Sequence, residues 1–391
     1  MVGWLASLTC VWGMALQWDD PLDPAIASFI APVMRDDAAL LSGLATEGGQ
    51  AYAYLLGIGT DAQRDPLAAG RDWLLAPQRQ VIQQALPKTL ALSDDLPLCD
   101  FIQDDCPAPL LAVRDVLAPQ LTDHATLLTR YRHVIRAPAV TPLFSPRIDA
   151  PTPQYAYLIQ ANRVQLTQWW YSVSPAHTKE TQQTKQTQPS TPALTSVVDL
   201  VMTNMQHIRH RLAQEDSLIG KMVYLTMFEE HLAWLRQVAA QHETLPAVWI
   251  TQLTPRERSL TLSVAREFAM IHQFNLSLSG RSDLFSPTEL IPQWAARMAY
   301  KPHITSNTHY RYYAHFARLS ELSEADYIAQ YQHWPVFEMG PVRRVRNLAG
   351  AVLSDIAIPD YRQYIERFHA VNRQITQWGD RQAQREMHAA Q

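Results

Sequence analysis

Glycine is scarce in this chain, at only 13 of its 391 residues. Folds built on many tight turns or glycine-rich phosphate loops need more of it, because glycine supplies backbone conformations that other residues avoid. Helices, in contrast, avoid glycine, which costs about 1 kcal/mol in a helix interior. The low glycine count therefore favours an all-α fold over classes rich in turns.

Apolar residues in the C-terminal half recur at helical spacing. Val197, Val201, Met205, Ile208 and Leu212 lie three or four positions apart, which places them on one helix face. Clear strand alternation is absent. The sequence predicts an all-α fold, either a multi-helix bundle or an irregular helical-hairpin array, with an N-terminal membrane helix.

Three signatures mark helix starts by pairing a capping side chain with a proline at the first helical position. They are Asp65-Pro66, Thr254-Pro255 and Ser286-Pro287. Glu257 and Glu289 complete capping boxes at the second and third signatures. The first signature predicts a helix to about Gln84 and the second a helix to about His272.

Residues 1–18 carry no charged side chain and are followed directly by Asp19 and Asp20. A membrane-spanning helix needs about 20 apolar residues, with a range near 17–25. We therefore expect residues 1–18 to form a single-pass anchor in the inner membrane, with the body on the periplasmic side. The segment lacks the basic region and cleavage site of a signal peptide. The alternatives are an N-terminal core helix or a true start upstream of Met1.

The three cysteines agree with an oxidising compartment. Cys10 lies in the apolar segment, whereas Cys99 and Cys106 lie in one proline-flanked loop. A short loop can bring two Cα atoms within about 5.5 Å, the usual separation in a disulfide. A structural zinc site needs four ligands, which this loop does not offer. We predict a Cys99–Cys106 disulfide, with two free thiols as the alternative.

One composition change divides the chain. Residues 174–192 are rich in Thr and Gln and nearly free of apolar side chains, so they predict a disordered linker. It separates an N-terminal helical region with the cysteine loop, residues 19–173, from a C-terminal helical domain, residues 193–391. The net charge of -4 gives no general attraction to nucleic acid, and we expect no nucleic-acid partner.

Lys221 is the most informative polar candidate, because it lies near the apolar stripe of its predicted helix. A desolvated lysine has a lowered pKa and can act as a base or nucleophile. Snorkelling, or pairing with a carboxylate from another helix, is the structural alternative and the one favoured here. Lys221 therefore remains a weak site candidate.

The other polar groups have simpler structural explanations. The spacing of His207 and His210 would suit a metal, but no further ligand pattern accompanies them. The arginine run 343–346 could meet phosphates or an acidic partner, although a solvated face or intramolecular pairing is favoured. The aromatic-rich run 309–316 is better explained by core contacts. We predict no metal and no cofactor.

Several short strings, scattered over most of the chain, resemble an uncharacterised family of bacterial envelope proteins with one N-terminal membrane segment. These strings are WDDPLDP (18–24), AYAYLLG (51–57) with RDPLAAGR (64–71), the two-cysteine loop, LLTRYRHVI (127–135), DSLIGKMV (216–223), LTPRERSL (253–260), and NLAGAVL (347–353) with its DYRQYIERFH continuation. The chain departs from the family in a shorter N-terminus and in the Thr/Gln-rich insert. The family has no known activity, so the resemblance implies an anchored helical envelope protein and lends no catalytic residues.

The leading hypothesis is a noncatalytic, membrane-anchored helical interaction or scaffold protein of the bacterial envelope, with an envelope protein as partner. One alternative is an envelope hydrolase or transferase whose site joins separated helices, with Lys221, Glu229, His231 and Glu267 as nominal candidates. Another is a soluble helical regulator. A cleft that gathers these polar groups would favour the enzyme.

Overall fold

The computed structural model describes residues 18–76, 90, 98, 100–103, 106–174, 191–242, 247–278, 299–331, 339–357 and 359–389. All regular secondary structure in these ranges is helical, which confirms the all-α prediction. The helices in chain order are α2 (Ala25–Ile30), η1 (Asp37–Ala39), α3 (Leu40–Leu44), α4 (Glu47–Leu56), α5 (Pro66–Leu75), α6 (Pro107–Ala112), α7 (Arg114–Thr122), α8 (Ala125–Arg136), α9 (Tyr155–Val173), α10 (Thr191–Gln214), α11 (Leu218–Gln241), α12 (Pro255–Arg258), α13 (Thr261–Leu278), α15 (Pro302–Glu321), α16 (Glu324–Tyr331), α17 (Pro341–Arg346), α18 (Leu348–Ala357) and α19 (Arg362–Ala389).

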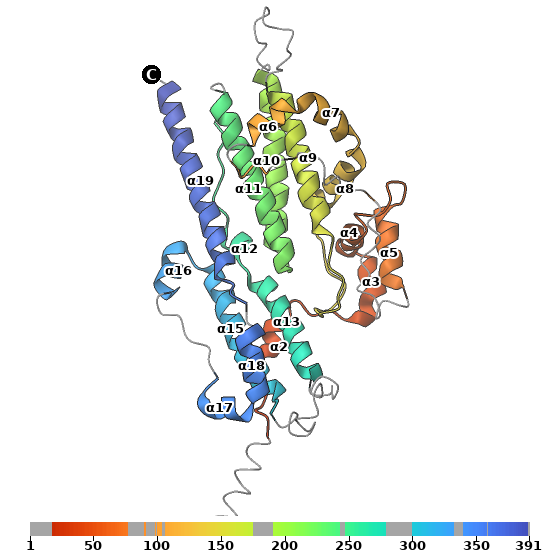
Figure 1. The fold of residues 1–391 in the computed structure, drawn as a ribbon, viewed down its shortest axis with the longest axis vertical. Helices are drawn as coiled ribbons and strands as arrows, with labels where there is room; N and C mark the ends of the chain where they lie inside the picture. The colour runs from red at the N-terminus through yellow and green to blue at the C-terminus, as the bar shows by residue number, and fades with distance from the viewer. Residues whose placement is uncertain are drawn as a thin grey trace, which may run out of the picture.

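The helices α8, α9, α10 and α11 pack together as the central bundle, and α19 runs along α11 (Figure 1). Their apolar faces share one large core. Val201, Met205, Ile208 and Leu212 of the predicted stripe are buried in that core. The helical spacing therefore identified the inward face of α10 correctly.

A second group of helices continues the bundle at its lower end in Figure 1. There α13 packs closely against α15, α2 contacts both of these helices, and α18 contacts α15. Tyr312 and Phe316 of α15 are buried, which confirms the core interpretation of the aromatic-rich run. The short helices α3, α4 and α5 form a smaller apolar cluster at the side.

The helix starts agree with the sequence better than the helix ends do. Asp65 accepts hydrogen bonds from the amides of Leu67 and Ala68 and begins α5, which ends at Leu75 rather than near Gln84. Thr254 and Glu257 form the expected capping box. The Ser286 signature and residues 175–190 of the predicted linker (174–192) lie outside the described residues, and the last two positions of that linker already belong to α10, which begins at Thr191.

The helix predicted from Thr254 to about His272 is interrupted, because α12 ends at Arg258 and α13 begins at Thr261. The interruption is supported by contacts from distant elements. Lys221 donates to the carbonyl of Ser259, and the Leu260 amide donates to Ser320 Oγ at 2.8 Å. These bonds satisfy backbone groups that a continuous helix would have paired internally.

Residues 18–24, which we call the N-terminal clamp, bind the lower end of the molecule. Asp19 accepts hydrogen bonds from the backbone amides of His303 (2.8 Å) and Ile304 (3.1 Å), at the start of α15. Lys301, the N-cap residue of α15, makes no side-chain cap of its own. A carboxylate from the other end of the sequence therefore caps α15, where it also opposes the positive end of the helix dipole.

Asp20 secures the same clamp to α17. It forms ion pairs with Arg343 and Arg346, each at 3.0 Å, and Arg346 also donates to the carbonyl of Trp18. The arginine run is therefore paired within the chain, as favoured from the sequence. Arg344 completes this pairing through Asp355.

Most of the predicted anchor, residues 1–17, lies outside the described residues. In the described ranges, no helix has both the length and the apolarity that crossing a membrane requires. The anchor therefore stays a prediction.

Candidate functional site

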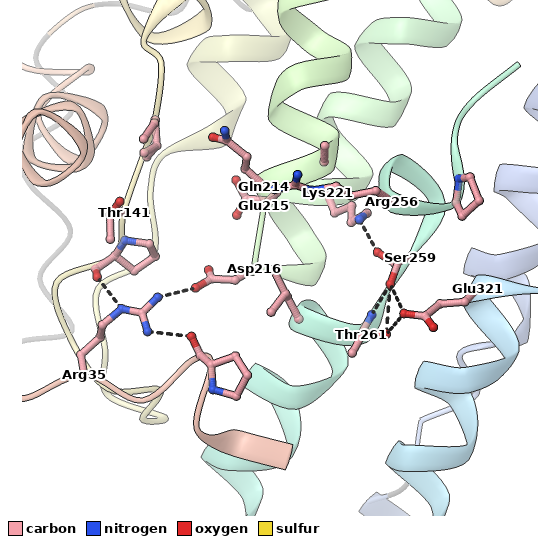
Figure 2. A pocket seen from close by; sticks show the side chains of 17 residues that line it. Arg35, Thr141, Gln214, Glu215, Asp216, Lys221, Arg256, Ser259, Thr261 and Glu321 are labelled. Atoms are coloured by element: carbon pink, nitrogen blue, oxygen red, sulfur yellow. Dashed lines mark hydrogen bonds and ion pairs between the residues drawn. The ribbon is translucent and has the colours of Figure 1, made fainter. Parts of the chain in front are cut away.

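A cleft of about 890 Å³ lies where the central bundle meets the lower helices (Figure 2). Its walls come from parts of the chain that are distant in sequence. These are the segment after α2, the loop before α9, the turn between α10 and α11, and the region from α12 to the start of α13. The charged side chains that line it are Arg35, Glu215, Asp216, Lys221, Arg256 and Glu321.

The turn between α10 and α11 carries the acidic part of the cleft. Ser217 caps α11 by accepting from the Gly220 amide at 3.3 Å. Glu215 accepts from the Ser217 amide at 3.1 Å and from the hydroxyl of Tyr155 at 3.2 Å. A side chain on Gly220 would lie 2.4 Å from that hydroxyl and 2.5 Å from Glu215 Oε1. The glycine therefore makes room for the Glu215–Tyr155 contact.

Burial has a marked effect on Glu215. Burial first, and then the neighbouring Asp216, raise the pKa of this carboxyl to about 7, against the lowering effects of the bonds from Ser217 and Tyr155 and of the Arg211 charge. Glu215 therefore changes charge near neutral pH.

Asp216 lies between two arginines from different elements. Its carboxylate is 3.3 Å from Arg266 of α13 and 3.7 Å from Arg35, and its side chain is buried. Burial raises its pKa, and the two guanidinium groups lower it. One oxygen, Oδ1, is buried without a hydrogen-bond partner. Because Asp216 also lines a second cavity of about 300 Å³, a polar ligand in either space could meet this acceptor.

Lys221 lies on the α11 side of the cleft and is only 2% exposed. Its ammonium donates to the carbonyl of Ser259 and lies 5.8 Å from the ring centre of Phe368 (Figure 2 shows the first contact). Burial lowers the pKa of Lys221 to about 8, and Glu215 and Glu257 act in the opposite direction. We call Arg35, Tyr155, Glu215, Asp216, Lys221 and Arg266 the cleft cluster.

The nominal catalytic candidates do not form one site. Lys221 lines the cleft, and Glu267 lines the second cavity. Glu229 instead forms an ion pair with Arg367 of α19. His231 is fully buried in the central bundle. The described structure therefore gives none of these four a nucleophile–base pairing with another of them.

A second set of polar side chains, most of them buried, lies within the central bundle and does not line the cleft. Asn162 and Arg163 donate to the two oxygens of Glu230 at 2.7 and 2.6 Å. Asn162 also accepts from Tyr131 at 2.8 Å. Burial raises the pKa of Glu230 to about 7, against the effect of Arg163. We call Tyr131, Asn162, Arg163, Asn204, Glu230 and His231 the closed network.

His231 belongs to this network in its neutral form. Its Nε2 accepts from Asn204 at 2.9 Å, and its Nδ1 donates to the carbonyl of Met227 at 2.7 Å, a tautomer assigned from these partners. Burial lowers its pKa to about 4. The ring is therefore committed to packing and hydrogen bonding at neutral pH.

The histidine pair and the predicted disulfide have separate outcomes. His210 contacts the carbonyl of Pro138 at 2.8 Å. Across the described ranges, no group of three or more His, Cys, Asp or Glu residues could hold a metal ion. Cys106 is buried and disulfide-bonded. Cys99 lies outside the described residues, so its pairing with Cys106 stays a prediction.

Sequence reasoning found Lys221 but missed the acidic half of the cleft. Glu215 and Asp216 follow directly after the apolar stripe of α10, at a helix end, which was the available signal. No local pattern pointed to Arg35 or Arg266. Comparisons of the chain with protein-family models, curated proteins and solved structures find no match.

Proposed function

We propose that this chain is a noncatalytic helical interaction protein of the bacterial envelope, held to the inner membrane by residues 1–18 with its body in the periplasm. The N-terminal clamp is the observation that carries the proposal. Asp19 and Asp20 are bonded to α15 and α17, so the body is joined to the chain directly after the uncharged segment. A tether of this kind fixes which end of the body faces the membrane.

The cleft is the proposed recognition site for an envelope protein partner. The cleft is lined by both positively and negatively charged side chains from several segments of the chain. Such a lining suits a partner surface that carries polar groups or groups of both charges. Most of the charges in the cleft already have partners within the chain: Asp216 with Arg266, and Lys221 with Ser259. Because these bonds fix the positions of the polar groups, the groups can determine the orientation of a bound ligand. The periplasmic side rests on the family resemblance and on the predicted Cys99–Cys106 disulfide.

An envelope hydrolase or transferase is the competing proposal. It is favoured by one observation, that Glu215 and Lys221 line the same cleft with pKa values near 7 and 8. Groups that titrate near neutral pH are suited to general acid–base catalysis. Purified protein that turned over an envelope substrate, and lost this activity on Lys221→Met substitution, would replace the noncatalytic proposal.

Cell fractionation tests the attachment. The full chain is compared with a chain lacking residues 1–17, which keeps the clamp, and the thiols of both are labelled before and after reduction. We expect the full chain in the membrane fraction, the shortened chain in the soluble fraction, and Cys99 and Cys106 protected until reduction. Recovery of both chains as soluble proteins with free thiols would instead favour a soluble helical regulator.

A further inference from the structure

Helices α17 and α18 lie at the lower end of the molecule in Figure 1, where α17 binds the N-terminal clamp, and both helices carry exposed apolar side chains. Val342 and Val345 lie one turn apart on α17, and Leu348, Val352 and Ile356 lie one turn apart on α18. All five side chains are between 49 and 78% exposed, and Trp18 is 71% exposed. We call Trp18 and these five residues the apolar end face.

The apolar end face is more than scattered surface hydrophobicity. Its two helices are consecutive and in contact, and each presents apolar side chains at helical spacing. The Arg346 guanidinium bonds the carbonyl of Trp18, so the tryptophan lies against α17. Clustered exposed apolar side chains mark contact with another protein or a lipid surface.

We propose that the apolar end face rests on the lipid surface of the membrane, as a contact made by the folded body in addition to residues 1–18. The proposal rests on the membrane attachment proposed above. The chain position supports it, since the clamp places Trp18, the residue that directly follows the uncharged segment 1–17, beside α17. A body tethered there brings the end face to the membrane.

The chemistry of the face fits the boundary between lipid headgroups and acyl chains. Tryptophan favours this boundary, and apolar helix faces enter it by about 5–10 Å. Asp20 and Asp355 offset most of the arginine charge on α17. Contact is therefore governed mainly by apolar burial, and we expect it on zwitterionic phosphatidylcholine as well as on anionic lipid.

The test places a fluorescent probe on the face of the full chain. Val345→Cys and, as a matched control on distant α7, Val116→Cys are labelled with bimane; both residues are about 70% exposed. The parent chain, labelled in the same way, gives the background from the native cysteines. Each protein is reconstituted in phosphatidylcholine vesicles and quenched with brominated lipid or with iodide in the water. Flotation of the vesicles reports attachment separately.

We expect brominated lipid, but not iodide, to reduce emission at position 345, and the reverse at position 116. Iodide quenching at both positions, in chains that float with the vesicles, would overturn the lipid contact while leaving the attachment intact. Protection of position 345 from both quenchers would also overturn it, because residues 1–17 or a second copy would then cover the face. Chains that do not float would overturn the attachment itself.

Discussion

The closed network and the cleft cluster differ in how completely the oxygens of their carboxylates are hydrogen-bonded. Burial raises the pKa of Glu230 and of Glu215 to about 7 in both regions. Both oxygens of Glu230 are bonded by Asn162 and Arg163, whereas Asp216 keeps a bare oxygen beside two cavities. A polar group whose bonds are complete contributes to a unique fold, and one left open beside a cavity is available to a ligand.

The largest expected effect comes from breaking the closed network. Glu230→Ala leaves Asn162 without its acceptor and leaves the partly buried Arg163 with Asp100 as its remaining acidic partner, and we expect a loss of about 3 kcal/mol in the free energy of unfolding. Urea denaturation measures this loss. The control is Glu324→Ala, which breaks an exposed pair with Arg373 and should cost about 1 kcal/mol or less. Equal losses would show that the network is not the more stabilising of the two.

Overpacking the cleft turn should cost less. Gly220→Ala forces a methyl group against Tyr155 and Glu215, and we expect about 2 kcal/mol of destabilisation in thermal or urea unfolding. The matched control is Gly379→Ala within α19, where the nearest atom to a new Cβ is 3.9 Å away. There alanine should stabilise by about 0.5–1 kcal/mol through its higher helix propensity. Two effects of the same sign would refute a packing role for Gly220.

Measuring stability across a series of pH values tests whether Glu215 in the cleft changes its charge near neutral pH. The folded pKa of Glu215, about 7, lies above its unfolded value of about 4.3, so protonation favours the folded state. Its stabilising contribution is complete below pH of about 4.3 and is lost as the pH rises through about 7. Glutamine resembles the protonated carboxyl. Glu215→Gln should therefore equal the parent at pH 4 and exceed it at pH 8.

The expected gain at pH 8 is about 1 kcal/mol, because water in the cleft reaches Glu215 and reduces the penalty for its charge. Chemical denaturation at a series of pH values measures it. A difference between the two proteins that stayed constant across the series would show that Glu215 does not titrate in this window.

Local signals predicted the helices well. The capping groups at Asp65 and Thr254 act within one turn of chain, and so they could be identified from the sequence. The break after Arg258 could not, because it depends on Lys221 and Ser320. These residues come into contact with it only in the folded chain.

The candidate site shows the same division. Lys221 was identified because its position relative to an apolar stripe is a local property of one helix. Asp216 acquires its role from Arg35 and Arg266, which reach it from segments that no spacing connects. The N-terminal clamp is a further case, since Asp19 caps a helix that begins near the other end of the chain. Contacts between segments that are distant in the chain leave no local spacing pattern, so a single sequence did not predict them.

The smallest change in stability is expected for a substitution of Lys221 in the cleft cluster. Lys221→Met keeps most of the buried stem and removes the charge, so the stability at pH 7 should change by less than about 1 kcal/mol. The Ser259 carbonyl loses its donor, but the variant no longer has the free-energy cost of burying an ammonium group, and this gain offsets the loss. Removing the positive charge should also raise the pKa of Glu215 further, which moves the pH-dependent loss of stability to higher pH. Chemical denaturation across pH measures both. A loss of stability as large as that of Glu230→Ala would contradict this expectation. It would show that the hydrogen bond of Lys221 stabilises the fold as strongly as the closed network does. Lys221 would then be no more available to a ligand than the side chains of that network.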